Sequence, residues 1–147
     1  MMNVNEILTN LWLGDIIDSK NSKFIHKVDI IINCTKNLPF CDKNKKCIRI
    51  NVEDNLQEKE INALYHYFEP ISKYVHSMLR KGKVILVHCY AGKQRSASIV
   101  CAYLMKYLNL DLNEAKYLIS TKRKHIFTPL PNFEKVLVLY ENELKNK

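Results

Sequence analysis

The stretch Val84-Ile85-Leu86-Val87-His88-Cys89-Tyr90-Ala91-Gly92-Lys93-Gln94-Arg95-Ser96 decides the fold of this chain. Its first four residues form an apolar run typical of a buried β-strand, and from Ala97 onward apolar residues recur at helical spacing. A loop therefore joins the end of a strand to the start of a helix. Backbone N–H groups and the positive end of the helix dipole meet at such a junction, so the sequence predicts an anion site there.

The polar residues of this loop suit reactive chemistry. A cysteine near a helix N-terminus and a cation ionises well below its ordinary pKa, into roughly the 3.5–7.5 range, so we expect Cys89 to be a thiolate nucleophile. Arg95 can donate two parallel N–H bonds to a phosphate. Gly92 permits a backbone conformation that turns successive N–H groups inward. Ser96 can donate its hydroxyl to the sulfur when the sulfur leaves, whereas His88 is expected to order the loop rather than to act as a base.

A second interpretation of the same residues is a structural cysteine beside a surface arginine. A cysteine and an arginine at this spacing occur by chance in many chains. The strand, the glycine, the serine and the helix together favour the reactive loop.

The pattern His-Cys-x5-Arg-Ser, followed by Ala102-Tyr103-Leu104-Met105, resembles the cysteine-based dual-specificity protein phosphatases. The resemblance extends over nearly the whole chain. The segments similar to the family are Leu11–Gly14 (its opening strand), Ile30–Cys34 (its next core strand), Ile50–Asp54 (the strand and loop of the general acid) and Pro129–Phe133 (the Pro-Asn-x-x-Phe element before the last helix). In that last element Leu130 replaces the usual asparagine, and an asparagine appears later, at Asn132.

Asp54 is the residue that falls on the family's acid position. Attack of a thiolate on a phosphate monoester releases an alkoxide or phenoxide, so a carboxylic acid that protonates this leaving group speeds the reaction. Asp54 follows the predicted strand Cys47–Asn51 in a polar stretch before a long helix. The alternatives are that Glu53 is the acid, or that both carboxylates are solvated loop charges.

The resemblance also implies substrate-binding residues. Those inside the loop are Tyr90, Ala91, Gly92, Lys93 and Gln94. Tyr90 is expected to line the pocket wall, while Gln94 stands where the family usually has a smaller residue and has no explanation from the sequence. In the turn Lys122–His125, Lys124 and His125 are closest to a family position that reaches the rim of the active site; the alternative is an exposed basic turn.

The resemblance implies a phosphatase that acts on phosphotyrosine and phosphoserine/threonine in proteins through a cysteinyl-phosphate, and we expect no cofactor and no metal. Lys93 favours a second interpretation, a phosphoinositide or RNA 5′-phosphatase, although related phosphoinositide phosphatases carry a second lysine where this chain has Tyr90. A phosphate-binding module without catalysis would be a different class of protein. A nucleic-acid-binding domain is a more distant alternative because no recognised motif organises the basic residues.

The length and composition limit the number of domains and the class of protein. A chain of 147 residues with 47% apolar and 10% aromatic residues predicts one globular domain over residues 1–147. The net charge of +8 suits an anionic substrate or nucleic acid, and it would equally serve solubility alone. No apolar run reaches membrane-spanning length and Met1–Glu6 lacks a signal-peptide pattern, so we expect a cytoplasmic protein. Little room for an N-terminal dimerisation arm precedes the first family-like strand, so we expect a monomer. The abundance of Lys, Asn, Ile and Tyr suggests an AT-rich or viral genome, in which case the location would be the host cytoplasm.

The five cysteines are expected to be free thiols. Cys34, Cys41, Cys47, Cys89 and Cys101 show no metal-ligand spacing, and a reducing compartment suits a thiolate catalyst. Cys101 is most simply a core residue. Cys34 ends a predicted strand near the reactive loop, so it is either a buried core residue or a partner for an oxidised Cys89.

The fold class predicted is α/β, with a central, mostly parallel sheet of about four to five strands flanked by helices. The predicted strands are 10–13, 28–33, 46–51 and 84–87. A long amphipathic stretch from Ile61 to Leu79 contains Pro70, where a helix would be kinked or split, and Gly82 ends it. Three helices follow: about 96–108, one beginning with a capping box of Asp111 and Glu114, and one capped by Asn132.

Overall fold

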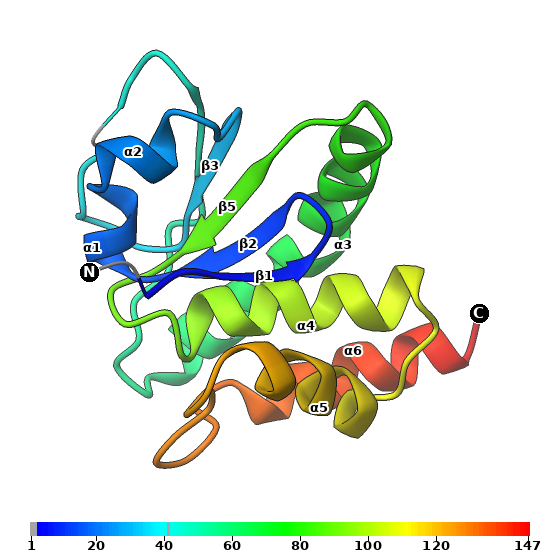
Figure 1. Ribbon diagram of the computed structural model, residues 1–147. Coiled ribbons are helices and arrows are strands. Elements are labelled where there is room, and N and C mark those ends of the chain that lie inside the picture. Colours follow the sequence, from blue (N-terminus) through cyan, green and yellow to red (C-terminus); the bar gives the residue numbers. More distant parts are fainter. Residues whose placement is uncertain (1–2, 41) are drawn as a thin grey trace.

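A computed structural model describes residues 3–40 and 42–147, so Cys41 lies outside the described residues (Figure 1). The strands are β1 (Asn5–Leu8), β2 (Leu11–Gly14), β3 (Ile30–Asn33), β4 (Lys46–Arg49) and β5 (Ile85–His88). The helices are α1 (Ile16–Ser19), α2 (Ser22–Ile25), α3 (Glu58–Arg80), α4 (Arg95–Tyr107), α5 (Leu112–Lys122) and α6 (Glu134–Lys145).

The five strands form one sheet in the order β1-β2-β5-β3-β4. All neighbouring pairs are parallel except β1 with β2, which is antiparallel. The predicted α/β class and mostly parallel sheet are confirmed. The strand β1 was not predicted, and it extends the sheet at one edge. The strand before the reactive loop, β5, lies in the middle, hydrogen-bonded to β2 on one side and β3 on the other.

Both faces of the sheet are covered, which explains the continuous apolar strands. Successive side chains of a strand point to opposite faces. Accordingly Ile30 and Ile32 belong to the large core beneath α3–α6, whereas Ile31 packs with Phe24 and Ile25 of α2. Figure 1 shows α4, α5 and α6 stacked together, away from α1 and α2.

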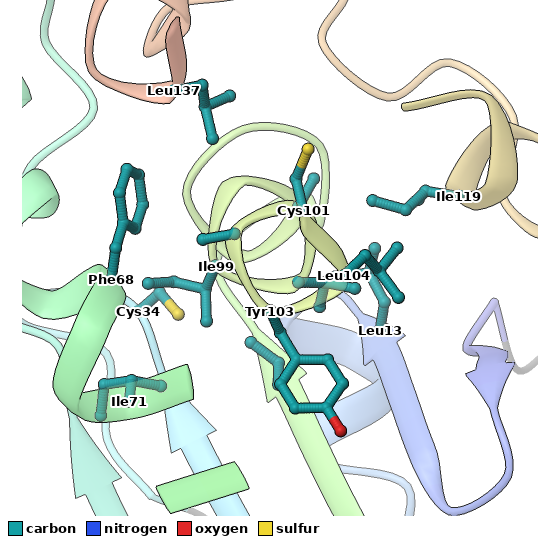
Figure 2. Packing of buried hydrophobic residues seen from close by; sticks show 14 of the residues in the cluster. Leu13, Cys34, Phe68, Ile71, Ile99, Cys101, Tyr103, Leu104, Ile119 and Leu137 are labelled. Carbon is teal, nitrogen blue, oxygen red and sulfur yellow. The ribbon is translucent and has the colours of Figure 1, made fainter. Parts of the chain in front are cut away.

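Helix α4 lies at the centre of the larger core. Its residues from Arg95 to Met105 are all buried, so it has no solvated face over that length. Figure 2 looks along this helix and shows Phe68 and Ile71 of α3, Ile119 of α5 and Leu137 of α6 arranged around it. A helix enclosed in this way holds its first turn, and hence Arg95 and Ser96, in a fixed position.

Helix α3 runs through the predicted break without splitting. Pro70 is exposed in its interior, so the carbonyl that loses its intrahelical N–H partner is near water. The helix ends as predicted: Gly82 has φ +77°, its N–H bonds to Leu79 O at 3.0 Å, and Lys83 N–H bonds to Met78 O at 3.1 Å. This pair of bonds is a Schellman motif.

The capping predictions had different outcomes for the last two helices. The capping box of Asp111 and Glu114 at the start of α5 is present in both directions. The predicted Asn132 cap of α6 is wrong, because the helix starts one residue later, with Phe133 at the N-cap and no side-chain cap. The Asn132 side chain instead donates a hydrogen bond to Asp54.

Within residues 3–40 and 42–147, every helix is too short or too polar to cross a bilayer.

Candidate active site

The reactive loop lies at the carboxyl end of the central strand. Cys89 directly follows β5, and Arg95 is the first residue of α4. In parallel sheets this edge is where ligands bind. The sequence therefore produces the strand–loop–helix unit that its apolar pattern predicts.

The sulfur of Cys89 has two polar neighbours and is nearly inaccessible. The Gly92 N–H donates to Sγ at 3.2 Å, and the Ser96 hydroxyl lies 3.1 Å from it. Cys89 is 3% exposed and Ser96 is fully buried. Hydrogen bonds that these two groups donate to a thiolate sulfur stabilise its negative charge.

The carbonyl groups of residues 90–93 all have donors outside the reactive loop. Four consecutive bonds show this: Ile16 N–H to Tyr90 O (3.1 Å), Arg123 Nη2 to Ala91 O (3.1 Å), Arg123 Nε to Gly92 O (2.8 Å) and Phe127 N–H to Lys93 O (2.8 Å). In a planar trans peptide the N–H points opposite to the C=O. With these carbonyls directed outward, the N–H groups of residues 91–94 are directed to the inside of the loop, which makes an anion cradle.

Arg123 is a site residue that the sequence prediction missed. It is 4% exposed, it holds the two loop carbonyls, and it also donates to Asn3 O and, at 2.9 Å, to Asn5 Oδ1. In the sequence it is one of four consecutive basic residues, Lys122–His125, and its residue type does not distinguish it from its neighbours. Helical spacing is the signal that could have identified Arg123 as buried. Ala115, Ile119 and Arg123 follow one another at four-residue steps, and the first two are buried.

Gly92 has to be glycine for the loop to approach this arginine. Its φ is +68°, and a Cβ there would lie 2.5 Å from both Arg123 Nη2 and Gly14 O. The second contact is with backbone, which cannot rotate away. The glycine therefore satisfies both the turn and the close packing.

Arg95 joins the reactive loop to the segment of Asp54. Its Nη1 donates to Val52 O at 2.9 Å, two residues before that aspartate. Its Nε is buried and has no acceptor among the residues that the structure describes. A buried charged donor without a partner is costly, so this edge of the guanidinium is suited to a bound oxyanion.

His88 is fully buried beneath the loop. Its Nδ1 lies 3.2 Å from Cys89 O, and burial lowers the pKa of its imidazole to about 4. The ring is therefore neutral at pH 7. A neutral ring bonded to the backbone suits the predicted ordering role better than that of a base.

Asp54 and Cys89 line the same pocket, of about 380 Å³. The other lining residues are Tyr90, Ala91, Lys93, Gln94, Arg95, Thr128 and Asn132. Glu53, the alternative acid, does not line it and faces a neighbouring hollow of about 250 Å³ instead. Its backbone N–H is bonded to Glu60 Oε1 at 2.9 Å. The geometry favours Asp54 over Glu53.

The predicted rim residues Lys124 and His125 lie beside this pocket rather than in it. They line a separate hollow of about 400 Å³ with Lys122, Arg123, Asn3 and Asn5. Ala91 and Lys93 line both spaces. The two hollows are therefore adjacent, with Lys93 between them.

Gln94, unexplained by sequence, is 6% exposed and spans two loops. Its Nε2 donates to Thr128 O at 3.2 Å and Leu130 O at 2.9 Å, and its Oε1 accepts from Asn132 N–H at 3.0 Å. All polar atoms of this side chain are used. It ties the reactive loop to the segment before α6.

Cys34 lies next to the reactive loop. Its N–H donates to His88 O at 2.8 Å, and its side chain is fully buried. Burial, reinforced by the nearby charge of Cys89, raises the pKa of the Cys34 thiol well above its usual value. A neutral buried thiol fits the core interpretation. A role toward oxidised Cys89 stays a prediction.

The described part of the chain offers no metal centre. Across residues 3–40 and 42–147, no group of three or more His, Cys, Asp or Glu side chains is arranged to hold an ion.

Comparisons with known proteins identify the class. The family model "Dual specificity phosphatase, catalytic domain" matches residues 11–143. Dual specificity protein phosphatase 9 of Homo sapiens is 35% identical over 95% of this chain and 36% of its own length. Protein 123R of Invertebrate iridescent virus 6 is 32% identical over 99% of this chain and 96% of its own length. The crystal structure of human DUSP28 superposes with a TM-score of 0.87 at 25% identity, covering 99% of this chain and 97% of that one.

The chain therefore belongs to the dual-specificity phosphatase family. It spans only about a third of the human relative's length.

Proposed function

We propose that this protein hydrolyses phosphate monoesters on proteins, at phosphotyrosine and at phosphoserine or phosphothreonine, through a cysteinyl-phosphate intermediate. The observation that carries the proposal is the single pocket lined by Cys89, Arg95 and Asp54. A nucleophile, an oxyanion-binding cation and an acid are the three groups that this reaction requires. The family membership supports the same chemistry.

In the first step the Cys89 thiolate attacks phosphorus and a P–S bond forms. The P–O bond to the substrate breaks, its electron pair remains on the leaving oxygen, and Asp54 gives that oxygen a proton. The free edge of Arg95 and the inward N–H groups hold the three equatorial oxygens. These donors are already oriented by outward-bonded carbonyls, so little reorganisation is needed.

In the second step water attacks the same phosphorus. Asp54, now a carboxylate, takes a proton from the water as the P–S bond breaks, and inorganic phosphate is released. The electron pair returns to Sγ, where the Ser96 hydroxyl and the Gly92 N–H stabilise the thiolate. The enzyme regains its starting state without a cofactor.

The basic hollow beside the pocket supports a preference for acidic substrates. Lys93, Lys122, Lys124 and His125 line it, and it adjoins the catalytic pocket at Lys93. We propose that it receives an acidic or second phosphorylated group of the protein substrate. Tyr90 is 65% exposed at the mouth of the catalytic pocket and offers a ring face to the substrate residue.

The test is hydrolysis of phenyl phosphate and its inhibition by orthovanadate. Cys89→Ser should abolish turnover, whereas Cys47→Ser, at a remote and partly exposed thiol, should keep it. Asp54→Asn should lower kcat/KM about 100-fold, within the range of general acid catalysis, while Glu53→Gln changes it less than about threefold. Absence of turnover from pH 5 to pH 8 would favour a phosphate-binding module without catalysis.

A second candidate is hydrolysis of phosphoinositides or of an RNA 5′-phosphate by the same chemistry. The observation that favours it is the pair of adjoining hollows, because a polyphosphorylated ligand could fill both. Comparing kcat/KM for a doubly phosphorylated peptide, a soluble phosphoinositide and a 5′-phosphorylated RNA ranks the three classes. A substrate-trapping pull-down with Asp54→Asn then tests for a protein target.

A further inference from the structure

The segment that carries Asp54 has no regular structure of its own. Residues 51–57 form neither helix nor strand. The peptide group just before Glu53 is held at both ends, by Arg95 at Val52 O and by Glu60 at Glu53 N–H. Those bonds fix the chain, but they leave the Asp54 side chain free to rotate about its own bonds.

The Asp54 side chain is held by Asn132. The Asn132 Nδ2 donates to Asp54 Oδ1 at 2.8 Å, and both residues line the catalytic pocket. Asn132 is held in turn, because its backbone N–H is bonded to Gln94 Oε1 and the preceding Leu130 O is bonded to Gln94 Nε2. A chain of hydrogen bonds thus runs from the loop of the nucleophile to the carboxylate.

We propose that Asn132 is a positioning residue for the general acid and that Gln94 fixes Asn132; this rests on the proposed function of Asp54. An oxygen that accepts an N–H bond is a poor site for a proton. Asn132 therefore keeps Oδ1 unprotonated and assigns the proton to Oδ2. In the first chemical step the Oδ2–H bond breaks and the proton passes to the leaving oxygen as the P–O bond breaks.

This role explains two departures from the family pattern together. Gln94 is larger than the usual residue because it must reach across to the Thr128–Asn132 segment. Asn132 lies outside its expected place in the Pro-Asn-x-x-Phe element because its amide belongs to the pocket and not to the cap of α6. Leu130, by contrast, contributes its carbonyl while its side chain is 72% exposed.

The dependence on the leaving group tests the proposal. An activated fluorinated coumarin phosphate needs little protonation of its leaving group, whereas phenyl phosphate needs much more. Asn132→Ala should lower kcat/KM about tenfold on phenyl phosphate and less than about twofold on the activated ester. The tenfold loss is a part of the roughly 10²–10⁴-fold rate acceleration that a general acid supplies. Gln94→Ala should show the same selectivity, and Leu130→Ala, the control in the same segment, should change neither substrate.

A double-mutant cycle separates positioning from general damage. In an Asp54→Asn background, Asn132→Ala should have no further effect on phenyl phosphate. Equal losses on both substrates, or an additional loss in that background, would overturn the proposal, as would unchanged kinetics. Thermal unfolding of each variant identifies any that misfolds. If Gln94→Ala misfolds, Gln94→Glu replaces it, because this side chain keeps the shape but loses both N–H donors. Wild type without activity on either ester would instead overturn the proposed function.

Discussion

At the residue scale, burial determines what His88 can do. The ring lies under the reactive loop with Nδ1 near Cys89 O, and its Nε2 has no hydrogen-bond partner within residues 3–40 and 42–147. Protonating it would leave a charge in the interior, close to Arg95 and Arg49. The histidine therefore stays neutral through the range in which the enzyme is expected to work.

This burial predicts a loss of stability in mild acid. The pKa of His88 is about 4 in the folded protein against 6.5 when unfolded, so the unfolded state binds more protons between those values. Its contribution to stability is complete above pH 6.5 and is lost as the pH falls toward 4, by about 2–3 kcal/mol. Urea unfolding of wild type and His88→Gln at pH 7 and pH 4.5 measures this contribution. The free energy of unfolding of the variant should fall less between the two pH values than that of wild type.

Exposed His66 supplies the comparison. His66→Gln should leave the pH dependence of the unfolding free energy as it is in wild type. If His88→Gln and wild type lose stability in parallel, the acid sensitivity belongs to other groups.

Single residues show where sequence reasoning succeeds and where it stops. The types and order of residues 88–96 were enough to predict Cys89, Arg95 and Ser96 as neighbours, because a strand, a loop and a helix leave few arrangements. The partners of Gln94 are backbone atoms far along the chain, whose positions depend on loop conformation. Residue type and the apolar spacing that follows it predict Asn132 as a helix cap, whereas its side chain bonds to Asp54 in a distant segment.

At the element scale, Glu69 connects three helices. Located on α3, it accepts from Tyr140 of α6 at 2.6 Å and from Lys106 of α4 at 3.0 Å. Burial raises the pKa of Glu69, but the hydrogen bonds from Tyr140 and Lys106 and the positive charges of Lys106 and Lys147 outweigh it and hold that pKa at about 2.

The depressed pKa of Glu69 predicts a second acid-sensitive contribution, at lower pH. The carboxylate stabilises the fold above its unfolded pKa of about 4.5, and this is lost as the pH falls toward 2. Allowing for its partial exposure, we expect Glu69→Gln to cost about 1 kcal/mol at pH 7 and almost nothing near pH 2.5. Denaturant unfolding followed by circular dichroism gives both values.

Glu58 is the matched control, since its ion pair with Lys135 is largely exposed. Glu58→Gln should leave stability nearly unchanged at both pH values. A constant deficit of Glu69→Gln across this range would mean that packing, and not charge, accounts for its effect.

Long helices with clear spacing were predicted, whereas two short helices and one edge strand were not. Two of the four parallel strands are continuous apolar runs, and the four long helices show helical spacing. Strand β1 has only two apolar residues, Ile7 and Leu8, and helices α1 and α2 have four residues each, too few to show a helical period. The caps of those helices, Asp15 and Asn21, are visible only once the chain is known to turn there.

At the scale of the whole molecule, the proposed chemistry uses only the side chains and backbone of this chain. We therefore expect EDTA, at concentrations that strip zinc and magnesium, to leave phenyl phosphate hydrolysis within about 20% of the untreated rate, because thiolate catalysis needs no Lewis acid. Hydrolysis that disappears with EDTA and returns with added metal would contradict this. The monomeric state and the cytoplasmic location stay predictions.

The order of the strands also has a consequence for how the molecule is made. The sheet is built on β5, whose partners β2 and β3 are both translated much earlier. Leu11 and Ile30 both pair with Ile85 in the sheet. The early strands therefore have no central neighbour while the ribosome is still synthesising α3. Formation of the sheet must then close long loops between distant strands. This slows folding and leaves the edges of the early strands uncovered for longer. The segment that carries Cys89 is thus also the one whose emergence from the ribosome lets the sheet form.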